Sequence, residues 1–234
     1  MKTKHGGFGA YYIRWHFPFF STILLLLSLV AFWDNLVSDV TQPSNSDPRM
    51  IFHGLFLLAW MILLVVQASL PAFGRVALHR KIGPWTMLVG LGVVLSTLFL
   101  FVAVWRGWDA LRPQILANRL FLALFAASIF AAWRMRYRAD WHKRLIYVGT
   151  LFMIEPVVSR TYDPLIATFM PPYPPGEDLH LFLAYLFGLW FAVYLCLFLY
   201  DWLSLRRLHP VTIGGFATTV AVIVLALTVA PAPI

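Results

Sequence analysis

The chain has 234 residues, of which 61% are hydrophobic and only 12% are charged, and its mean hydropathy is +0.77. An ordinary soluble domain is about 25% charged and about 45–50% apolar, so this composition excludes a soluble domain. It also excludes a disordered chain and a disulfide scaffold, because apolar residues dominate and the single cysteine, Cys196, has no partner within the chain.

Seven apolar stretches are long enough to cross a bilayer, whose hydrocarbon core of about 30 Å takes about 20 helical residues. In chain order they are Phe17–Trp33, Ile51–Phe73, Ile82–Val104, Ile115–Trp133, Leu145–Tyr162, Leu179–Tyr200 and Val211–Val229. We expect helices and not a β-barrel, because backbone groups in lipid must pair within their own segment and no series of short alternating strands is present. The first stretch lacks a small-residue cleavage site after it, so we expect a helix there and not a signal peptide.

These stretches predict an all-α, polytopic bundle of seven transmembrane helices that forms a single domain over 1–234. Its core is expected in the helices of about 51–162, with the first, sixth and seventh helices at the periphery.

Basic residues gather on one predicted side of the membrane. Thirteen of the eighteen Lys and Arg residues lie on that side: Lys2, Lys4, Arg14, Arg75, Arg80, Lys81, Arg134, Arg136, Arg138, Lys143, Arg144, Arg206 and Arg207. The positive-inside rule therefore predicts a cytoplasmic N-terminus and an outer C-terminus, as in a multi-pass protein of a bacterial inner (cytoplasmic) membrane. The net charge of +8 is explained by contact with anionic lipids, with no need for nucleic acid. Asp201, Arg206, Arg207 and His209 are interpreted as a charged belt at this interface.

Glu155 is expected near the middle of the fifth span, where an ionisable group costs about 2.5–3.5 kcal/mol and is a functional candidate. Pro156 follows it and removes a backbone donor, which predicts a kink. Arg160 lies about 140° around the same helix from Glu155, so Arg119, beside Asn118, is the expected cross-helix partner. The alternative is a buried pair that only joins the fourth and fifth helices.

The histidines fall at two depths. His53 and His180 open helices on the outer side, whereas His79, His142 and His209 precede helices on the cytoplasmic side. Two levels of imidazole are what two six-coordinate haems need, with each iron bound by one His from each of two facing helices. Histidines tolerated at the membrane interface are the alternative, and zinc is disfavoured because the usual ligand spacings are missing. The similar runs His79-Arg80-Lys81-Ile82 and His142-Lys143-Arg144-Leu145 suggest that two hairpins are parallel repeats.

One pattern extends over just under half of the chain and consists of His53, Gln67, His79-Arg80-Lys81-Ile82-Gly83, His142-Lys143 and Arg160. It resembles a family of uncharacterised bacterial membrane proteins. The piece Leu78-His79-x-x-Ile82-Gly83 is also similar to a haem-ligating stretch of the transmembrane di-haem b-type cytochromes that ascorbate reduces. That resemblance implies a four-helix core with one His per helix, with His53 outer and His79 and His142 inner. The fourth position holds Asn118 and Arg119, which leaves His180 as the only replacement.

Four functions are consistent with these features. The first is b-type haem electron transfer with a quinol or small reductant, using His53, His79, His142 and His180. The second is a carrier or binding protein whose outward-facing polar cavity, formed by Asn118, Arg119, Glu155 and Arg160, takes an anionic or amphiphilic ligand. The others are a metal-dependent membrane enzyme acting on lipid and a structural subunit of an oligomer or larger complex. The sequence does not decide whether the protein is an enzyme.

Overall fold

The computed structural model describes residues 7–170 and 177–231. Lys2, Lys4 and the proline-rich segment 171–176 lie outside the described residues. Every regular element within the described residues is helical: α1 (Gly7–Ala31), η1 (Asp34–Ser38), η2 (Pro43–Ser46), α2 (Pro48–Ala72), α3 (Val76–Ala103), α4 (Pro113–Arg134), α5 (Ala139–Phe152), α6 (Glu155–Leu165), η3 (Ala167–Phe169), α7 (Glu177–Leu205) and α8 (Pro210–Val229). The all-α prediction is confirmed.

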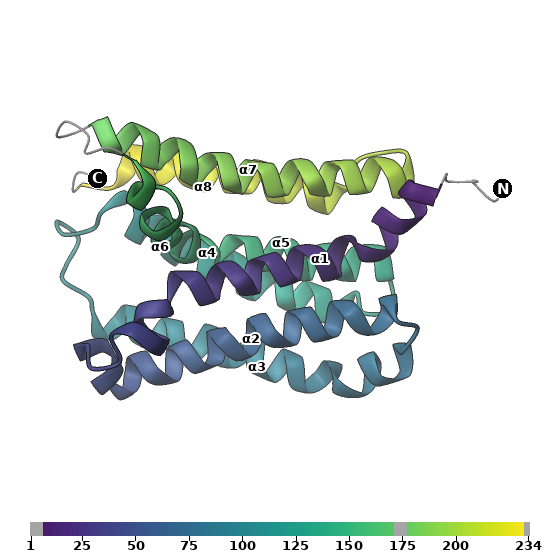
Figure 1. Ribbon diagram of the computed structural model, residues 1–234, viewed down its shortest axis with the longest axis horizontal. Coiled ribbons are helices and arrows are strands. Elements are labelled where there is room, and N and C mark those ends of the chain that lie inside the picture. The colour runs from purple at the N-terminus through teal and green to yellow at the C-terminus, as the bar shows by residue number, and fades with distance from the viewer. Residues whose placement is uncertain (1–6, 171–176, 232–234) are drawn as a thin grey trace.

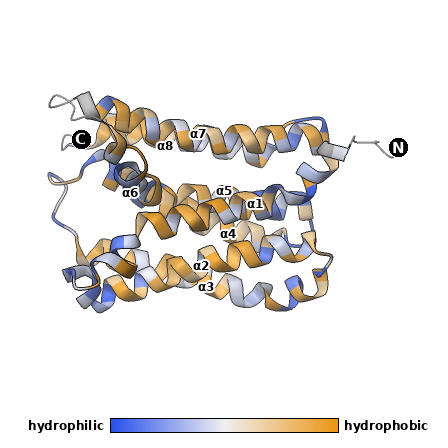
Figure 2. Ribbon diagram, in the orientation of Figure 1, coloured by the Kyte–Doolittle hydropathy of each residue, from blue (hydrophilic) through white to orange (hydrophobic). Residues whose placement is uncertain are grey.

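Six helices are long and apolar enough to cross a membrane: α1, α2, α3, α4, α7 and α8. Their middle turns are hydrophobic, and hydrophilic residues gather at the helix ends and in the connections (Figure 2). The protein is therefore an integral, multi-pass membrane protein. Several helices begin before the predicted spans, because the first turns carry polar or charged residues that an apolar run does not include.

The predicted span Leu145–Tyr162 is not one helix. It is divided into α5 (14 residues) and α6 (11 residues), each too short to qualify as a span by itself. The break lies at Met153 and Ile154, directly before Glu155. Pro156 has no N–H for the carbonyl oxygen of Phe152, four residues earlier, and this explains why the helix stops and restarts here. The predicted kink is thus a complete break.

The helices form an elongated bundle (Figure 1). Helix α2 packs against α1 and α3, α4 packs against α3, α5 and α8, and α7 packs against α1, α6 and α8. The start of α1 and the α2–α3, α4–α5 and α7–α8 connections lie together at one end, which we call the basic end because of Arg75, Arg134, Arg136, Arg138, Arg206 and Arg207.

The close approach of α5 to α4 and α8 depends on glycine. A Cβ atom added at Gly215 of α8 would lie 2.4 Å from Cγ1 of Val148 on α5. A Cβ atom at Gly149 of α5 would lie 2.9 Å from Cβ of Ser128 on α4. At the basic end, Nε of Arg14 donates to the carbonyl oxygen of Ala72, the last residue of α2, at 2.8 Å. These contacts fix the helices that carry the candidate site.

Candidate functional site

Two of the predicted histidines meet at the basic end. His79 lies in the first turn of α3 and His142 in the first turn of α5. Their ring centres are 6.2 Å apart, and the ring planes are inclined by 79°. Both side chains are half-buried. The sequence predicts that these two residues lie at the same depth. In the structure their side chains are also direct neighbours.

The ring of His79 is held by a carbonyl group that a proline leaves free. Its Nδ1 lies 3.1 Å from the backbone oxygen of Gln67 on α2. In a regular helix this oxygen would accept from the residue four positions later, but that residue is Pro71, which has no N–H. A carbonyl oxygen only accepts, so Nδ1 of His79 carries the proton.

His142 is held in the same way by the end of α4. Its Nδ1 lies 2.9 Å from the backbone oxygen of Ala132. Ala132 is among the last four residues of α4, whose carbonyl groups have no intrahelical partner. In both hairpins, a His early in the second helix thus satisfies a free carbonyl oxygen late in the first.

The two hydrogen bonds fix the tautomer that each ring has in its neutral form, with the proton on Nδ1 and the lone pair on Nε2. No hydrogen bond joins either Nε2 to the described residues. A histidine that ligates a metal usually donates its other N–H to a backbone carbonyl or carboxylate, which fixes the tautomer and the ring orientation. His79 and His142 therefore have the hydrogen bonding of metal ligands, although the same bonds also stabilise the two hairpins.

Gln67 also supports this site through its side chain. The amide Nε2 donates to the hydroxyl oxygen of Thr86 on α3 at 2.9 Å, while Oε1 is buried and has no hydrogen-bond partner among the described residues. One turn beyond His79, Gly83 faces open space, since a Cβ atom added there would meet nothing within 4 Å. The surface of α3 is thus uncovered one turn beyond His79.

His53 and His180 are not brought together. Nδ1 of His53 lies 3.5 Å from the Ser96 hydroxyl and 3.4 Å from the Thr97 hydroxyl, both on α3. His180 is exposed in the first turns of α7, which starts on the opposite side of the bundle from the start of α2 (Figure 1). An outer site shared by these two histidines has no support in this arrangement.

The prediction that Arg119 is the partner of Glu155 is wrong. Nδ2 of Asn118 donates to Oε2 of Glu155 at 2.9 Å. Arg119 instead donates to the carbonyl oxygen of Phe101 at 3.3 Å. Successive residues on a helix point about 100° apart, so Asn118 faces α6 while its neighbour Arg119 faces α3.

Arg160 is also separate from Glu155. Its Nη1 donates to Oδ1 of Asn35 in η1 at 3.3 Å, and its guanidinium lies over the Phe32 ring. Glu155, Arg119 and Arg160, which were predicted to line one cavity, therefore make three separate contacts. Only the contact of Glu155 with Asn118 joins two of the residues predicted for this cavity.

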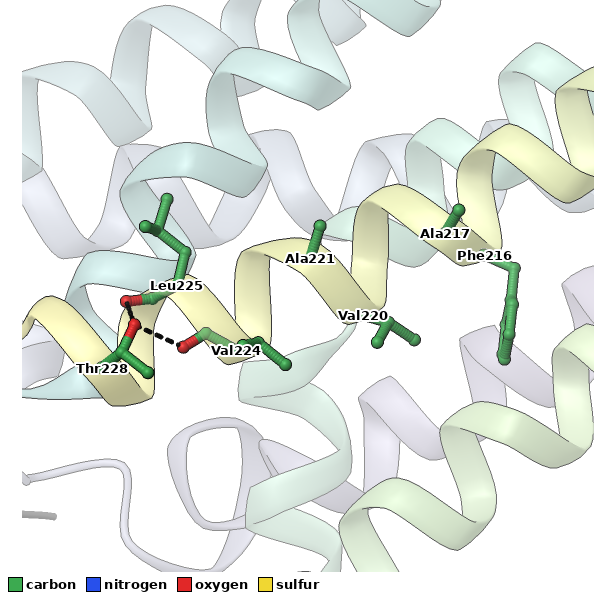
Figure 3. Close-up of a pocket in the computed structure, with 7 residues that line it drawn as sticks. All are labelled: Phe216, Ala217, Val220, Ala221, Val224, Leu225 and Thr228. Atoms are coloured by element: carbon green, nitrogen blue, oxygen red, sulfur yellow. Dashed lines mark hydrogen bonds between the residues drawn. The ribbon is translucent and has the colours of Figure 1, made fainter.

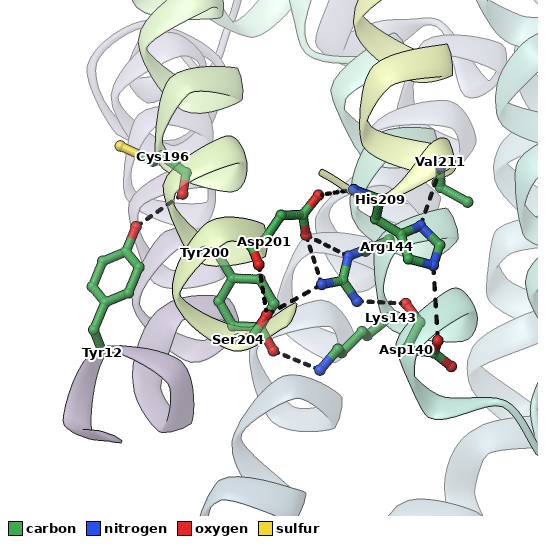
Figure 4. Close-up of polar contacts among 10 residues, drawn as sticks. All are labelled: Tyr12, Asp140, Lys143, Arg144, Cys196, Tyr200, Asp201, Ser204, His209 and Val211. Carbon is green, nitrogen blue, oxygen red and sulfur yellow. Dashed lines mark hydrogen bonds and ion pairs between the residues drawn. The ribbon is translucent and has the colours of Figure 1, made fainter. Parts of the chain in front are cut away.

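Asp201, a member of the predicted charged belt, forms a buried ion pair with Arg144 of α5 that the sequence did not reveal (Figure 4). Arg144 and Asp201 are fully buried and 2.6 Å apart. Arg144 also donates to the carbonyl oxygen of Asp140, and the second oxygen of Asp201 accepts from the backbone N–H of His209 at 2.8 Å. The feature of the sequence that could have indicated this pair is that Asp201 is an acidic residue at the basic end.

The same cluster sets the protonation of His209, which lies before α8 and outside the predicted spans. Burial lowers the pKa of this imidazole below its ordinary value, and the charge of Arg144 lowers it further, while Asp201 and Asp140 act in the opposite direction. The neutral ring caps α8, because its Nδ1 accepts from the N–H of Val211 at 3.2 Å.

His16 was also missed. It is 1% exposed in α1, and neither ring nitrogen has a hydrogen-bond partner among the described residues. Aromatic rings surround it at 4.7–6.0 Å between ring centres: Tyr12, Phe17, Phe20, Tyr147 and Tyr200. Its position after Trp15 in an aromatic stretch gave no indication of full burial.

The surface grooves are apolar. One follows α8 past Ala217, Ala221 and Leu225, and its Thr228 hydroxyl is already bonded to the helix backbone (Figure 3). Another lies between α2 and α3, where the Phe56 ring packs directly against Gly92. Such grooves fit lipid chains and offer little polar chemistry, so the histidine pair remains the candidate site.

No known protein family, curated protein or solved structure matches the chain. The resemblance of the Leu78-His79-x-x-Ile82-Gly83 piece to di-haem cytochromes, like that of the longer stretch to uncharacterised membrane proteins, therefore stays a prediction, and the functional argument depends on the geometry.

Proposed function

We propose that this membrane protein binds a b-type haem between His79 and His142 at the basic end and transfers electrons. The observation that carries the proposal is the pair of imidazoles, each with Nδ1 bonded to a free backbone carbonyl and with Nε2 left free. The ring centres lie 6.2 Å apart, so two side chains from different helices are close enough for both to serve as ligands of one bound group.

The number of ligands favours haem over a bare metal ion. Within residues 7–170 and 177–231, no group of three or more His, Cys, Asp or Glu side chains could hold a metal ion. A bare ion at this site would have only the two imidazoles, whereas the porphyrin supplies the equatorial ligands of its own iron. When bound, haem would supply one-electron redox chemistry. The chain would supply the two imidazoles that hold the group, with their tautomers fixed by the backbone carbonyls.

The orientation proposed from the basic residues places this site near the cytoplasm. If α5 and α6 together complete a seventh crossing, the start of α1 and the end of α8 lie on opposite sides, as Figure 1 shows for the bundle. The positive-inside rule then assigns the basic end to the cytoplasmic face of a bacterial inner membrane. The proposed electron donor is a quinol from the bilayer or a small reductant from the cytoplasm.

Because His53 has no second imidazole beside it, the proposal is for one haem site and not the two that the sequence suggested. His53 contacts hydroxyl groups of α3, and these contacts are long, at 3.4 and 3.5 Å.

The test is a reduced-minus-oxidised absorption spectrum and an iron analysis of purified protein. We expect a Soret band and an α band that are lost in His79→Ala and in His142→Ala. His180→Ala is the matched control, because His180 is exposed and far from the pair, and it should keep both bands. Added imidazole should restore part of the spectrum of a correctly folded His79→Ala variant. A protein without these bands and without iron, or bands that persist in both variants, would refute the proposal.

A further inference from the structure

The connection between α3 and α4 differs in charge from the connection between α1 and α2, which lies at the same end of the bundle (Figure 1). The α1–α2 connection carries Asp34, Asp39 and Asp47. The 104–112 connection has Arg106 and Arg112 against the single acid Asp109, and Arg119 follows in α4. It therefore offers positive charge at the end where the positive-inside rule predicts little.

Arg119 is held in place without a counter-ion. Its Nη2 donates to the carbonyl oxygen of Phe101, in the last turn of α3, at 3.3 Å. The guanidinium carbon lies 5.1 Å from the centre of the Phe101 ring and 4.7 Å from that of Trp105, so both rings contribute cation–π contacts. No carboxylate of the described residues forms an ion pair with Arg119.

The guanidinium also keeps unused hydrogen-bonding capacity. Its Nε is buried and has no hydrogen-bond partner among the described residues. A guanidinium has five N–H groups in a planar fork that matches phosphate and carboxylate oxygens. A fixed, half-buried cation with free donors is costly in a membrane unless an anion compensates it.

The depth of this group indicates where the anion comes from. Arg119 lies about 9 Å along α4 from its first residue, but its side chain reaches back to the last turn of α3. Because α3 is long and apolar enough to span the bilayer, we expect its last turn at the boundary between hydrocarbon and headgroups. Trp105 and Trp108, 41% and 70% exposed, lie in the adjoining connection, and Leu98 and Val102 expose an apolar face of α3 nearby.

We propose that Arg119 binds the phosphate group of a phospholipid from the leaflet opposite the basic end. Trp105 and Trp108 would contact the glycerol region, and the exposed side chains of α3 would contact an acyl chain. The combination of a fixed cation, interfacial tryptophans and an apolar face fits an amphiphile better than a soluble anion, which would gain nothing from the last two features.

The experiment is native mass spectrometry of the full chain in detergent, titrated in parallel with phosphatidylglycerol and with diacylglycerol of the same acyl chains. We expect a phosphatidylglycerol adduct and a much weaker diacylglycerol adduct in the unmodified protein. Arg119→Gln should weaken phosphatidylglycerol binding by about tenfold, since a charge-assisted hydrogen bond is removed.

Arg49→Gln is the matched control, because Arg49 lies at the same end but has its own counter-ion, Asp47, at 2.7 Å. This variant should bind the lipid as the unmodified protein does. Equal binding of the two lipids, displacement of the lipid by inorganic phosphate, unchanged binding in Arg119→Gln or an equal loss in Arg49→Gln would each overturn the proposal. The comparison of the two lipids needs no variant, so it decides the question even if Arg119→Gln does not fold.

Discussion

Two polar clusters lie at the basic end of the bundle, and they differ in how fully their hydrogen-bonding groups are used. Arg144 and Asp201 are fully buried, bonded to each other and to the backbone around them. His79 and His142 are half-buried, and each has one ring nitrogen bonded to a carbonyl group and the other nitrogen free. The hydrogen-bonding groups of the ion pair are thus bonded within the chain, whereas each ring of the histidine pair keeps one nitrogen without a bond to the described residues.

This difference separates a structural role from a binding role. A buried ion pair that the protein itself satisfies joins α5 to α7 and the start of α8, and offers little to a ligand. Two imidazoles with fixed tautomers and free nitrogens offer a pair of metal ligands. Ionisable residues in a membrane protein are functional candidates by default, but their bonding decides which of them keep that status.

The largest effect is expected for Asp201→Ala, which leaves the buried Arg144 without its counter-ion. Breaking a buried pair in this way should lower the free energy of unfolding by about 3–5 kcal/mol. The measurement is denaturant unfolding in mixed micelles. Asp140→Ala is the control, because the Asp140 side chain is 48% exposed and 3.8 Å from His209, and it should lower stability by less than about 1 kcal/mol. Similar losses in both variants would contradict the structural role.

A smaller loss is expected at the α5–α8 contact that lies beside this cluster. In Gly215→Ala the new Cβ would lie 2.4 Å from Cγ1 of Val148, a β-branched side chain that cannot move aside easily. Overpacking of this kind costs about 1–3 kcal/mol. The neighbouring variant Gly214→Ala is the control, since it meets nothing within 4 Å and should keep or slightly raise stability. Equal stability of the two variants would show that α5 and α8 are not this close.

The histidine pair should contribute less to folding than the ion pair does. His79→Ala removes one hydrogen bond to the Gln67 carbonyl oxygen, and we expect a loss of about 0.5–1.5 kcal/mol in protein without a bound group. His142→Ala should behave alike. The measurement is the unfolding midpoint of each histidine variant compared with that of Asp201→Ala. If His79→Ala lowers the free energy of unfolding as much as Asp201→Ala does, the histidine pair has a structural role.

The smallest effect concerns pH. Since the pKa of His209 is lowered in the folded protein, the folded state favours the neutral ring. The contribution of His209 is therefore fully present above about pH 6.5 and declines as the pH falls through the lowered value. We expect the unfolding midpoint to drop with acidification and to drop less in His209→Ser, whose hydroxyl can still cap α8. The same pH dependence in both proteins would contradict this assignment.

The sequence predicts much of the fold because lipid imposes strong constraints. Long apolar runs and the distribution of Arg and Lys indicate the helices and their common ends, and Pro156 marks the place where α5 stops. The pairing of His79 with Gln67 was also open to prediction, because Pro71 leaves that carbonyl oxygen free. The burial of Arg144 with Asp201, which is 57 residues away, was not, because it depends on which helices become neighbours. The same holds for the direction in which Arg119 points.

The most direct test of the central claim is the haem content of the purified chain, determined by pyridine haemochrome absorbance against protein concentration. The account predicts one haem per chain, lost when either His79 or His142 is replaced and kept when His53 or His180 is replaced. A chain that binds no haem after reconstitution with excess haem, or one whose haem depends on His53 and His180 instead, would contradict it.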